Sequence, residues 1–120
     1  MKTELEQCLR LRFTEIYPYG LMAHESDDEC TVYRLLRHFG SYCSSHLEAQ
    51  QTAEIMTVVN ELYHSKDLFC QNAIENEFLA VVAEHLRPAD LMTHLNRIPA
   101  PLQIVYIKVL LEILKHQKTA

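Results

Sequence analysis

The stretch "NAIENEFLAVVAEHL", residues 72–86, decides the fold class because its apolar residues recur at intervals of three and four. This period predicts an amphipathic helix with one face turned to a core. Glu75 lies close to that face, since apolar residues follow it at i+4, i+7 and i+11. Its carboxylate either reaches water at the border of the face or is buried in a polar contact that fixes the helix register. Asn72 and Asn76 flank Glu75, and we expect the three residues to form this polar segment.

The same period extends on both sides of this helix, so we expect an all-α protein. Two Ser/Thr-x-x-Glu sequences, Thr3 to Glu6 and Ser26 to Glu29, have the form of capping boxes that begin helices. The expected helices cover residues 3–17, 26–43, 48–64, 67–87 and 101–117, with a short turn at 91–95; Ser65 or Asp67 caps the fourth. With only two glycines and four prolines, the chain offers few turns for a fold of many strands. The sequence therefore predicts one compact domain over residues 1–120, an irregular bundle of five to six helices whose pairs are compatible with HEAT-like layers.

The expected last helix, residues 101–117, is more apolar than the others. The residues before Pro99 and Pro101 should be extended, and Pro101 suits the first helical position. About two-thirds of the circumference is apolar, which exceeds the stripe of an ordinary surface helix. Two explanations remain open: a central helix covered by several others, or an exposed apolar face that docks a partner or a second copy. For the second explanation the candidate docking residues are Ile104, Ile107, Leu111 and Leu114.

Charge and composition exclude several classes of ligand. The formal charge of −5 and the absence of a clustered basic footprint argue against nucleic acid and anionic membrane as partners. No apolar run reaches the roughly 20 residues of a membrane-spanning helix, and charged residues interrupt the first 20 residues, so we expect a cytoplasmic protein without a signal peptide. The acidic stretch "HESDDE" is either a helix cap or a patch that meets a basic partner, and its candidate partner-binding residues are Glu25, Asp27, Asp28 and Glu29.

No group of residues in the sequence has the pattern of an active site. The phosphate-binding glycine motifs are absent, and the most suggestive metal pattern, Cys43-x-x-His46, lacks the second pair that a structural zinc site needs. We therefore expect no catalytic residue, no metal ligand and no cofactor. The four cysteines lie far apart, and we expect no disulfides.

Two segments resemble a family of small bacterial helical domains of unknown function, DUF7674. The first is "NELYHSKDLFCQNAIENEFLAVVAEHL", residues 60–86, with an acidic loop residue at Asp67 and an apolar pair at Phe78-Leu79; the second is "LRLRFTEIYP", residues 9–18, with Arg12-Phe13. Ala80 stands where many members carry an acidic residue, so no role of that acid is carried over to this chain. The resemblance implies a helical, cytoplasmic, bacterial protein, and similar small acidic domains often act as immunity proteins or antitoxins.

These observations favour a non-enzymatic domain that binds another protein through apolar and acidic surface, with a toxin as the partner that the resemblance implies. A structural homodimer built on the last helix is one alternative. A metal-dependent enzyme that uses His and Cys side chains is another.

Overall fold

A computed structural model describes residues 2–18, 20, 29–65 and 67–119, and the side chains of 5–18, 20, 31–65 and 67–116. All the regular structure in these ranges is helical, so the all-α prediction is confirmed. The elements are α1 (Lys2–Arg12), α3 (Glu29–Ser45), α4 (Gln50–Tyr63), α5 (Leu68–Ala73), η1 (Ile74–Leu79), α6 (Ala80–Glu84), η2 (Pro88–Asp90), α7 (Leu91–Arg97) and α8 (Ala100–Thr119). Since α5, η1 and α6 form one continuous helix, the described ranges contain six helices.

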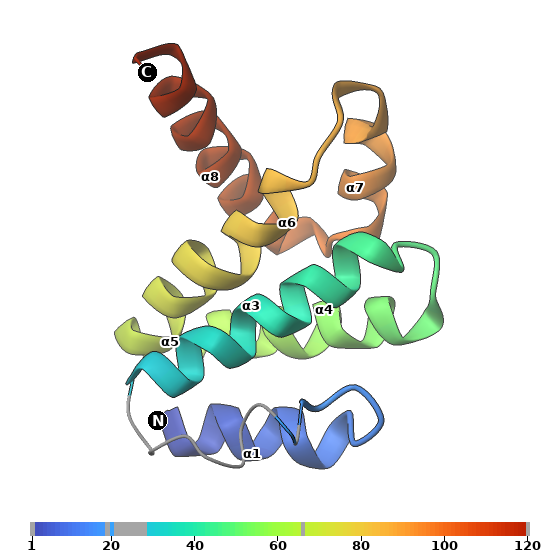
Figure 1. The fold of residues 1–120 in the computed structure, drawn as a ribbon, viewed down its shortest axis with the longest axis vertical. Helices are drawn as coiled ribbons and strands as arrows, with labels where there is room; N and C mark the ends of the chain where they lie inside the picture. The colour runs from blue at the N-terminus through green and yellow to red at the C-terminus, as the bar shows by residue number, and fades with distance from the viewer. Residues whose placement is uncertain (1, 19, 21–28, 66, 120) are drawn as a thin grey trace.

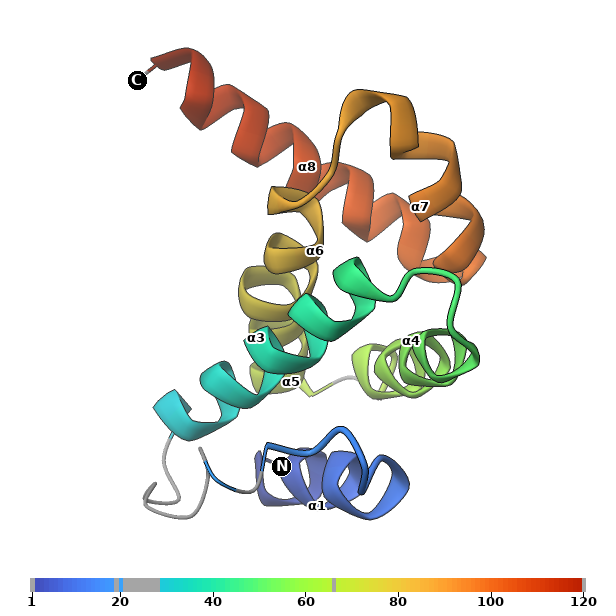
Figure 2. The same cartoon turned by 45° about the vertical axis from the view of Figure 1, so that its right-hand side comes forward.

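The helices pack around α3 and the continuous helix that contains η1. Helix α1 lies along one side of the bundle, and α8 lies at the opposite end, so the two ends of the chain are far apart (Figures 1 and 2). Helix α6 contacts α3 on one side and α8 on another. In both views the C-terminal half of α8 extends past the other helices, which places part of this apolar helix outside the bundle.

The core is apolar and centres on the contact between α3 and η1. Phe39 and Phe78 are fully buried there, and the Phe13 ring meets the Phe39 ring edge-on with centroids 5.8 Å apart. Gly40 allows this close approach, because a Cβ atom at that position would lie 2.8 Å from the backbone oxygen of Phe78. Gly40 is therefore a contact point inside α3.

Residues 74–79 form a π-helical segment, which the apolar period of the sequence did not predict. The wider turn lies between two ordinary α-helical segments, and no proline interrupts it. Such segments insert one residue into a helix and are frequent at functional sites. Glu75 belongs to this segment, so its direction is set by the wider turn and by the helices that pack on it.

The first helix ends earlier than the sequence predicted. Helix α1 stops at Arg12, whereas the apolar pattern continues to Tyr17, and turns replace the helix between Phe13 and Tyr17. Tertiary hydrogen bonds hold these turns: the Tyr17 hydroxyl donates to Glu6 at 2.5 Å, and the carbonyl of Ile16 accepts from the His38 Nε2 at 2.9 Å. Phe13 and Tyr17 stay buried, so the pattern correctly identified core residues but not their backbone conformation.

Other boundaries differ in smaller ways. Ile98 is extended, which confirms the effect of the following proline, but Ala100 is already the first residue of α8. The expected turn at 91–95 is the helix α7, preceded by the short η2. Asp67 occupies the N-cap position of α5 with no capping hydrogen bond from its side chain. The two capping boxes lie outside the described residues, because the side chains of Thr3, Ser26 and Glu29 are not described.

Candidate functional site

Helix α8 has two apolar faces, and only one of them is packed. Leu102, Tyr106 and Val109 are buried against the bundle, where α8 contacts α6 and η1. On a helical wheel the opposite face carries the residues predicted for docking, and they are exposed by 77% at Ile104, 40% at Ile107, 60% at Leu111 and 44% at Leu114. One side of this apolar helix is therefore covered by the bundle, and the other side is open.

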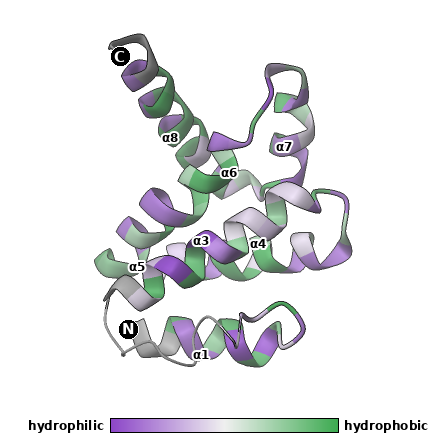
Figure 3. Ribbon diagram, in the orientation of Figure 1, coloured by the Kyte–Doolittle hydropathy of each residue, from purple (hydrophilic) through white to green (hydrophobic). Residues whose placement is uncertain are grey.

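We call these four residues the α8 ridge. Their spacing of three, four and three residues is that of the a and d positions of a coiled-coil heptad. The hydropathy colouring shows the apolar character continuing along α8 where the helix leaves the bundle (Figure 3). The α8 ridge is thus an exposed apolar strip with heptad spacing, which a second amphipathic helix could match. It lies on a helix that the bundle covers on one side only.

Glu75 makes two polar contacts near the packed side of α8. The Tyr63 hydroxyl donates to its Oε2 at 2.5 Å, and the Lys108 ammonium lies 2.9 Å from its Oε1. The Glu75 side chain is 18% exposed, so it is a mostly buried carboxylate at the border of the core. Burial, together with the nearby Glu75 charge and hydrogen bond, raises the pKa of Tyr63 to about 12. One carboxylate therefore joins α4, η1 and α8.

A groove of about 460 Å³ lies beside this contact, between the η1–α6 segment and α8. Ala80, Val109 and Ile113 supply its apolar part, while Glu112 and His116 line it further along α8. The predicted polar segment is only partly assembled. Asn76 lines the groove next to Glu75 and also lines a separate hollow of about 170 Å³, which it shares with the exposed Asn72.

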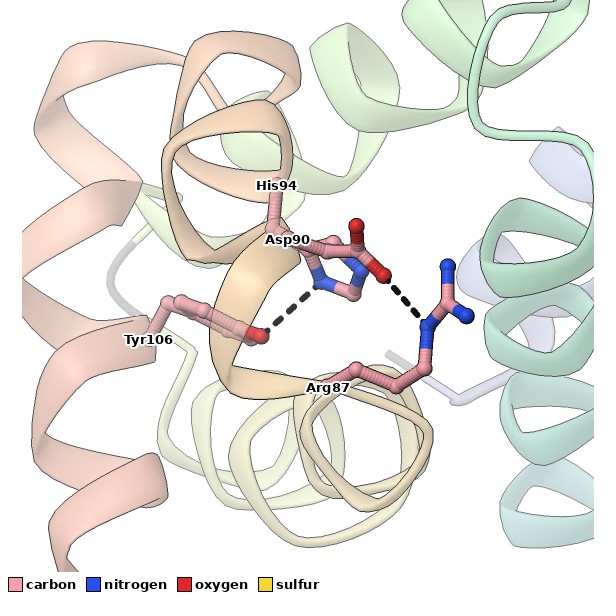
Figure 4. Close-up of polar contacts among 4 residues, drawn as sticks. All are labelled: Arg87, Asp90, His94 and Tyr106. Carbon is pink, nitrogen blue, oxygen red and sulfur yellow. Dashed lines mark hydrogen bonds and ion pairs between the residues drawn. The ribbon is translucent and has the colours of Figure 1, made fainter.

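A second polar cluster, which no sequence pattern predicted, joins α7 to α8 (Figure 4). The side chain of His94 is buried, with its Nδ1 3.1 Å from the Tyr106 hydroxyl, and Arg87 pairs with Asp90 at 2.7 Å. Burial lowers the pKa of His94, an effect that Asp90 opposes, and burial raises the pKa of Tyr106 to about 12. A neutral imidazole and a protonated phenol suit one another here, because the phenol O–H can donate to Nδ1. No local sequence motif predicts the contact between His94 and Tyr106, since the two residues are 12 positions apart on different helices.

A cleft of about 540 Å³ opens beside His94. Its lining residues come from the end of α3, the loop after it, and the segment from His85 onward: Ser44, Ser45, His46, Leu47, Glu48, Ala49, His85, Arg87, Asp90, Thr93 and His94. The Nδ1 atoms of His46 and His85 each bond a backbone carbonyl four residues earlier in the chain. Among the described side chains, however, no three His, Cys, Asp or Glu residues come close enough to hold a metal ion.

The cysteine of the Cys43-x-x-His46 pattern lies in the core. Cys43 is fully buried, and burial raises its pKa to about 12, although a hydrogen bond with Thr52 acts in the opposite direction. A thiol with this pKa holds its proton at neutral pH. The neighbouring His46 stacks on Tyr42 with ring centroids 4.3 Å apart. Cys8 and Cys43 are free thiols.

The acidic candidate residues lie outside the residues that the structure describes. Glu25, Asp27 and Asp28 fall in the undescribed segment, and only the backbone of Glu29 is described. Of the residues predicted to bind a partner, the structure therefore describes the side chains of the four apolar residues on α8 and none of the four acidic ones.

Over the described ranges, none of the helices combines the length and the apolar character that crossing a membrane requires.

Comparison with known proteins identifies a family. Residues 6–115 match the family described as Domain of unknown function (DUF7674), so the match covers most of the chain and the chain belongs to that family. No curated protein and no solved structure matches this sequence.

Proposed function

We propose that this member of the DUF7674 family is a non-enzymatic protein-binding domain whose α8 ridge receives an amphipathic helix of another protein. The observation that carries the proposal is the pair of faces on α8. One face anchors the helix to the bundle, and the ridge on the other face remains exposed at a/d spacing.

The size of the ridge supports docking of a helix. Full burial of one leucine or isoleucine side chain contributes about 1.5–3 kcal/mol. The four ridge residues are each partly exposed, so covering all four contributes a hydrophobic free energy of several kcal/mol. Association itself costs about 4–15 kcal/mol in lost translational and rotational freedom, so the gain is comparable to the lower end of that range. The ridge thus supplies a large part of the binding energy, and contacts along its edges must add the rest.

The test uses a synthetic three-heptad peptide with leucine at a and d and glutamine at e and g. Fluorescence anisotropy measures its binding to three proteins: wild type, Leu111→Asp on the ridge, and Leu68→Asp, a control at a leucine on α5 that is slightly more exposed (68% against 60%). We expect wild type and the control to bind alike and the ridge variant to bind at least tenfold more weakly. Equal binding by all three proteins, or no binding by any, overturns the proposal.

Sedimentation velocity of the protein alone addresses the homodimer alternative. The proposal expects a monomer whose mass is unchanged by Leu111→Asp. A wild-type dimer that Leu111→Asp dissociates would instead assign the ridge to a second copy of the chain.

We propose further that the partner is a toxin and that the domain acts as its immunity protein or antitoxin. The resemblance to small acidic inhibitory domains and the exposed ridge support this proposal. Coexpression with the product of the adjacent gene, followed by measurement of the mass of the complex, tests it. We expect a complex that forms with wild type and fails to form with Leu111→Asp; an adjacent product that binds both proteins equally, or neither, contradicts it.

A further inference from the structure

We propose that the helix received by the α8 ridge carries carboxylates along the edge that faces Lys108 and Lys115. This inference rests on the proposed function and adds the chemistry of the partner. It comes from the residues that flank the ridge, which decide the partner and orientation of paired helices.

The two edges of the ridge differ in charge. With Ile104 and Leu111 at a, the e positions are Lys108 and Lys115, both exposed. The g positions on the other edge, Gln103 and Leu110, carry no charge. A helix that docks on the ridge therefore meets one basic edge and one neutral edge.

Lys108 is held in place at this basic edge. Its ammonium lies 2.9 Å from Glu75, whose other oxygen accepts the Tyr63 hydroxyl, so the bundle fixes the lysine from its inner side. The Lys108 side chain is nevertheless 61% exposed. An ammonium has three N–H donors, and one carboxylate does not use all of them, so a second carboxylate from a docked helix can share the same lysine.

These charges disfavour pairing of α8 with a second copy of itself. In an antiparallel pair e positions face e positions, which places lysine against lysine. In a parallel pair e faces g, which places the lysines against Gln103 and Leu110. Neither arrangement gives an opposite charge across the interface, whereas an acidic edge on a different helix does so in both orientations.

The experiment compares the glutamine-edged peptide with two variants that carry glutamate or lysine at every e and g position. Both charged peptides repel themselves, so they remain monomeric at low concentration. We expect the glutamate-edged peptide to bind about tenfold more tightly than the lysine-edged one at low salt, with the difference shrinking as salt is raised. Lys115→Glu should reduce or reverse this preference. Arg10→Glu, the same charge change at an exposed position on α1, should leave the preference as in wild type.

The outcomes separate the two proposals. Binding of all three peptides with equal affinity overturns the acidic-edge inference and leaves the ridge as a docking surface. A preference that Arg10→Glu changes as much as Lys115→Glu also overturns it, because net charge would then be the cause. Failure of even the glutamine-edged peptide to bind overturns the proposed function itself.

Discussion

The Tyr63 hydroxyl donates a 2.5 Å hydrogen bond to Glu75, and this contact connects the last turn of α4 to the π-helical segment. The same carboxylate holds Lys108 of α8, which flanks the docking ridge. The Glu75 carboxylate lies near the apolar face of its own helix, and its polar partners come from two other helices. The Tyr63 hydroxyl and the Lys108 ammonium reduce the free-energy cost of burying it.

Removal of the Tyr63 hydroxyl should destabilise the fold. Tyr63→Phe leaves one oxygen of a mostly buried carboxylate without its donor, so we expect the free energy of unfolding to fall by about 1–3 kcal/mol. Urea denaturation followed by circular dichroism measures the change. Tyr42→Phe, at a half-buried tyrosine that packs its ring on His46, is the matched control and should stay within about 0.5 kcal/mol of wild type. Equal effects at the two tyrosines would mean that the bond to Glu75 contributes nothing specific.

A methyl group at Gly40 should be poorly tolerated. The added Cβ atom would lie 2.8 Å from the Phe78 carbonyl oxygen and 3.3 Å from the Val81 Cβ, so α3 and η1 must separate. We expect Gly40→Ala to cost about 1–3 kcal/mol of stability, although alanine favours helix. Gly20→Ala, where no atom of the described residues lies within 4 Å of the new Cβ atom, is the control and should cost less than about 0.5 kcal/mol. A Gly40→Ala protein as stable as wild type would show that the helices pack less closely than described.

The two faces of α8 should differ in their sensitivity to truncation. Leu102→Ala removes a fully buried side chain and should lower the free energy of unfolding by about 2–5 kcal/mol. Leu111→Ala removes a side chain that is 60% exposed and should change it by about 0.5 kcal/mol or less. Chemical denaturation of both variants measures the contrast. A large loss at Leu111 would place the ridge inside the core and remove the basis of the docking proposal.

His94 should make stability depend on pH in the mildly acidic range. Burial lowers its pKa from the ordinary value of 6.5, so the unfolded chain binds a proton more readily than the folded chain. The contribution of neutral His94 is therefore fully present above about pH 6.5 and is lost as the pH falls toward the lowered value. The loss of stability between pH 7.5 and 5 should be smaller in His94→Gln than in wild type. Met92→Gln, at an exposed site on the same helix, should follow wild type, and parallel curves for all three proteins would contradict the assignment.

The cysteines should differ in reactivity. Burial raises the pKa of Cys43 to about 12, so at pH 8 only about one molecule in ten thousand carries the reactive thiolate. Cys8 is only half-buried. We expect iodoacetamide to label Cys8 in the folded protein and Cys43 only in urea, as mass spectrometry of the digested protein would show. Rapid labelling of Cys43 without denaturant would contradict its buried position.

Local patterns in the sequence predicted most of the fold. The apolar period of residues 72–86 and its equivalents identified the helices, because side chains three and four residues apart share one face. The same reasoning showed that residues 101–117 carry more apolar surface than one packed face needs, but it left open whether Ile104, Ile107, Leu111 and Leu114 are covered or exposed. Each of these conclusions depends on neighbours in sequence, which the chain itself specifies.

Only the tertiary structure decided which face of α8 is covered, that residues 74–79 form a π-helical turn, and that Glu75 meets Tyr63 and Lys108. The buried pair of His94 and Tyr106 belongs to the same group. These contacts join residues that lie 12 or more positions apart, and they depend on how the helices are placed against one another. A helical period states which side chains share a face, but only the packing of other helices determines what that face meets.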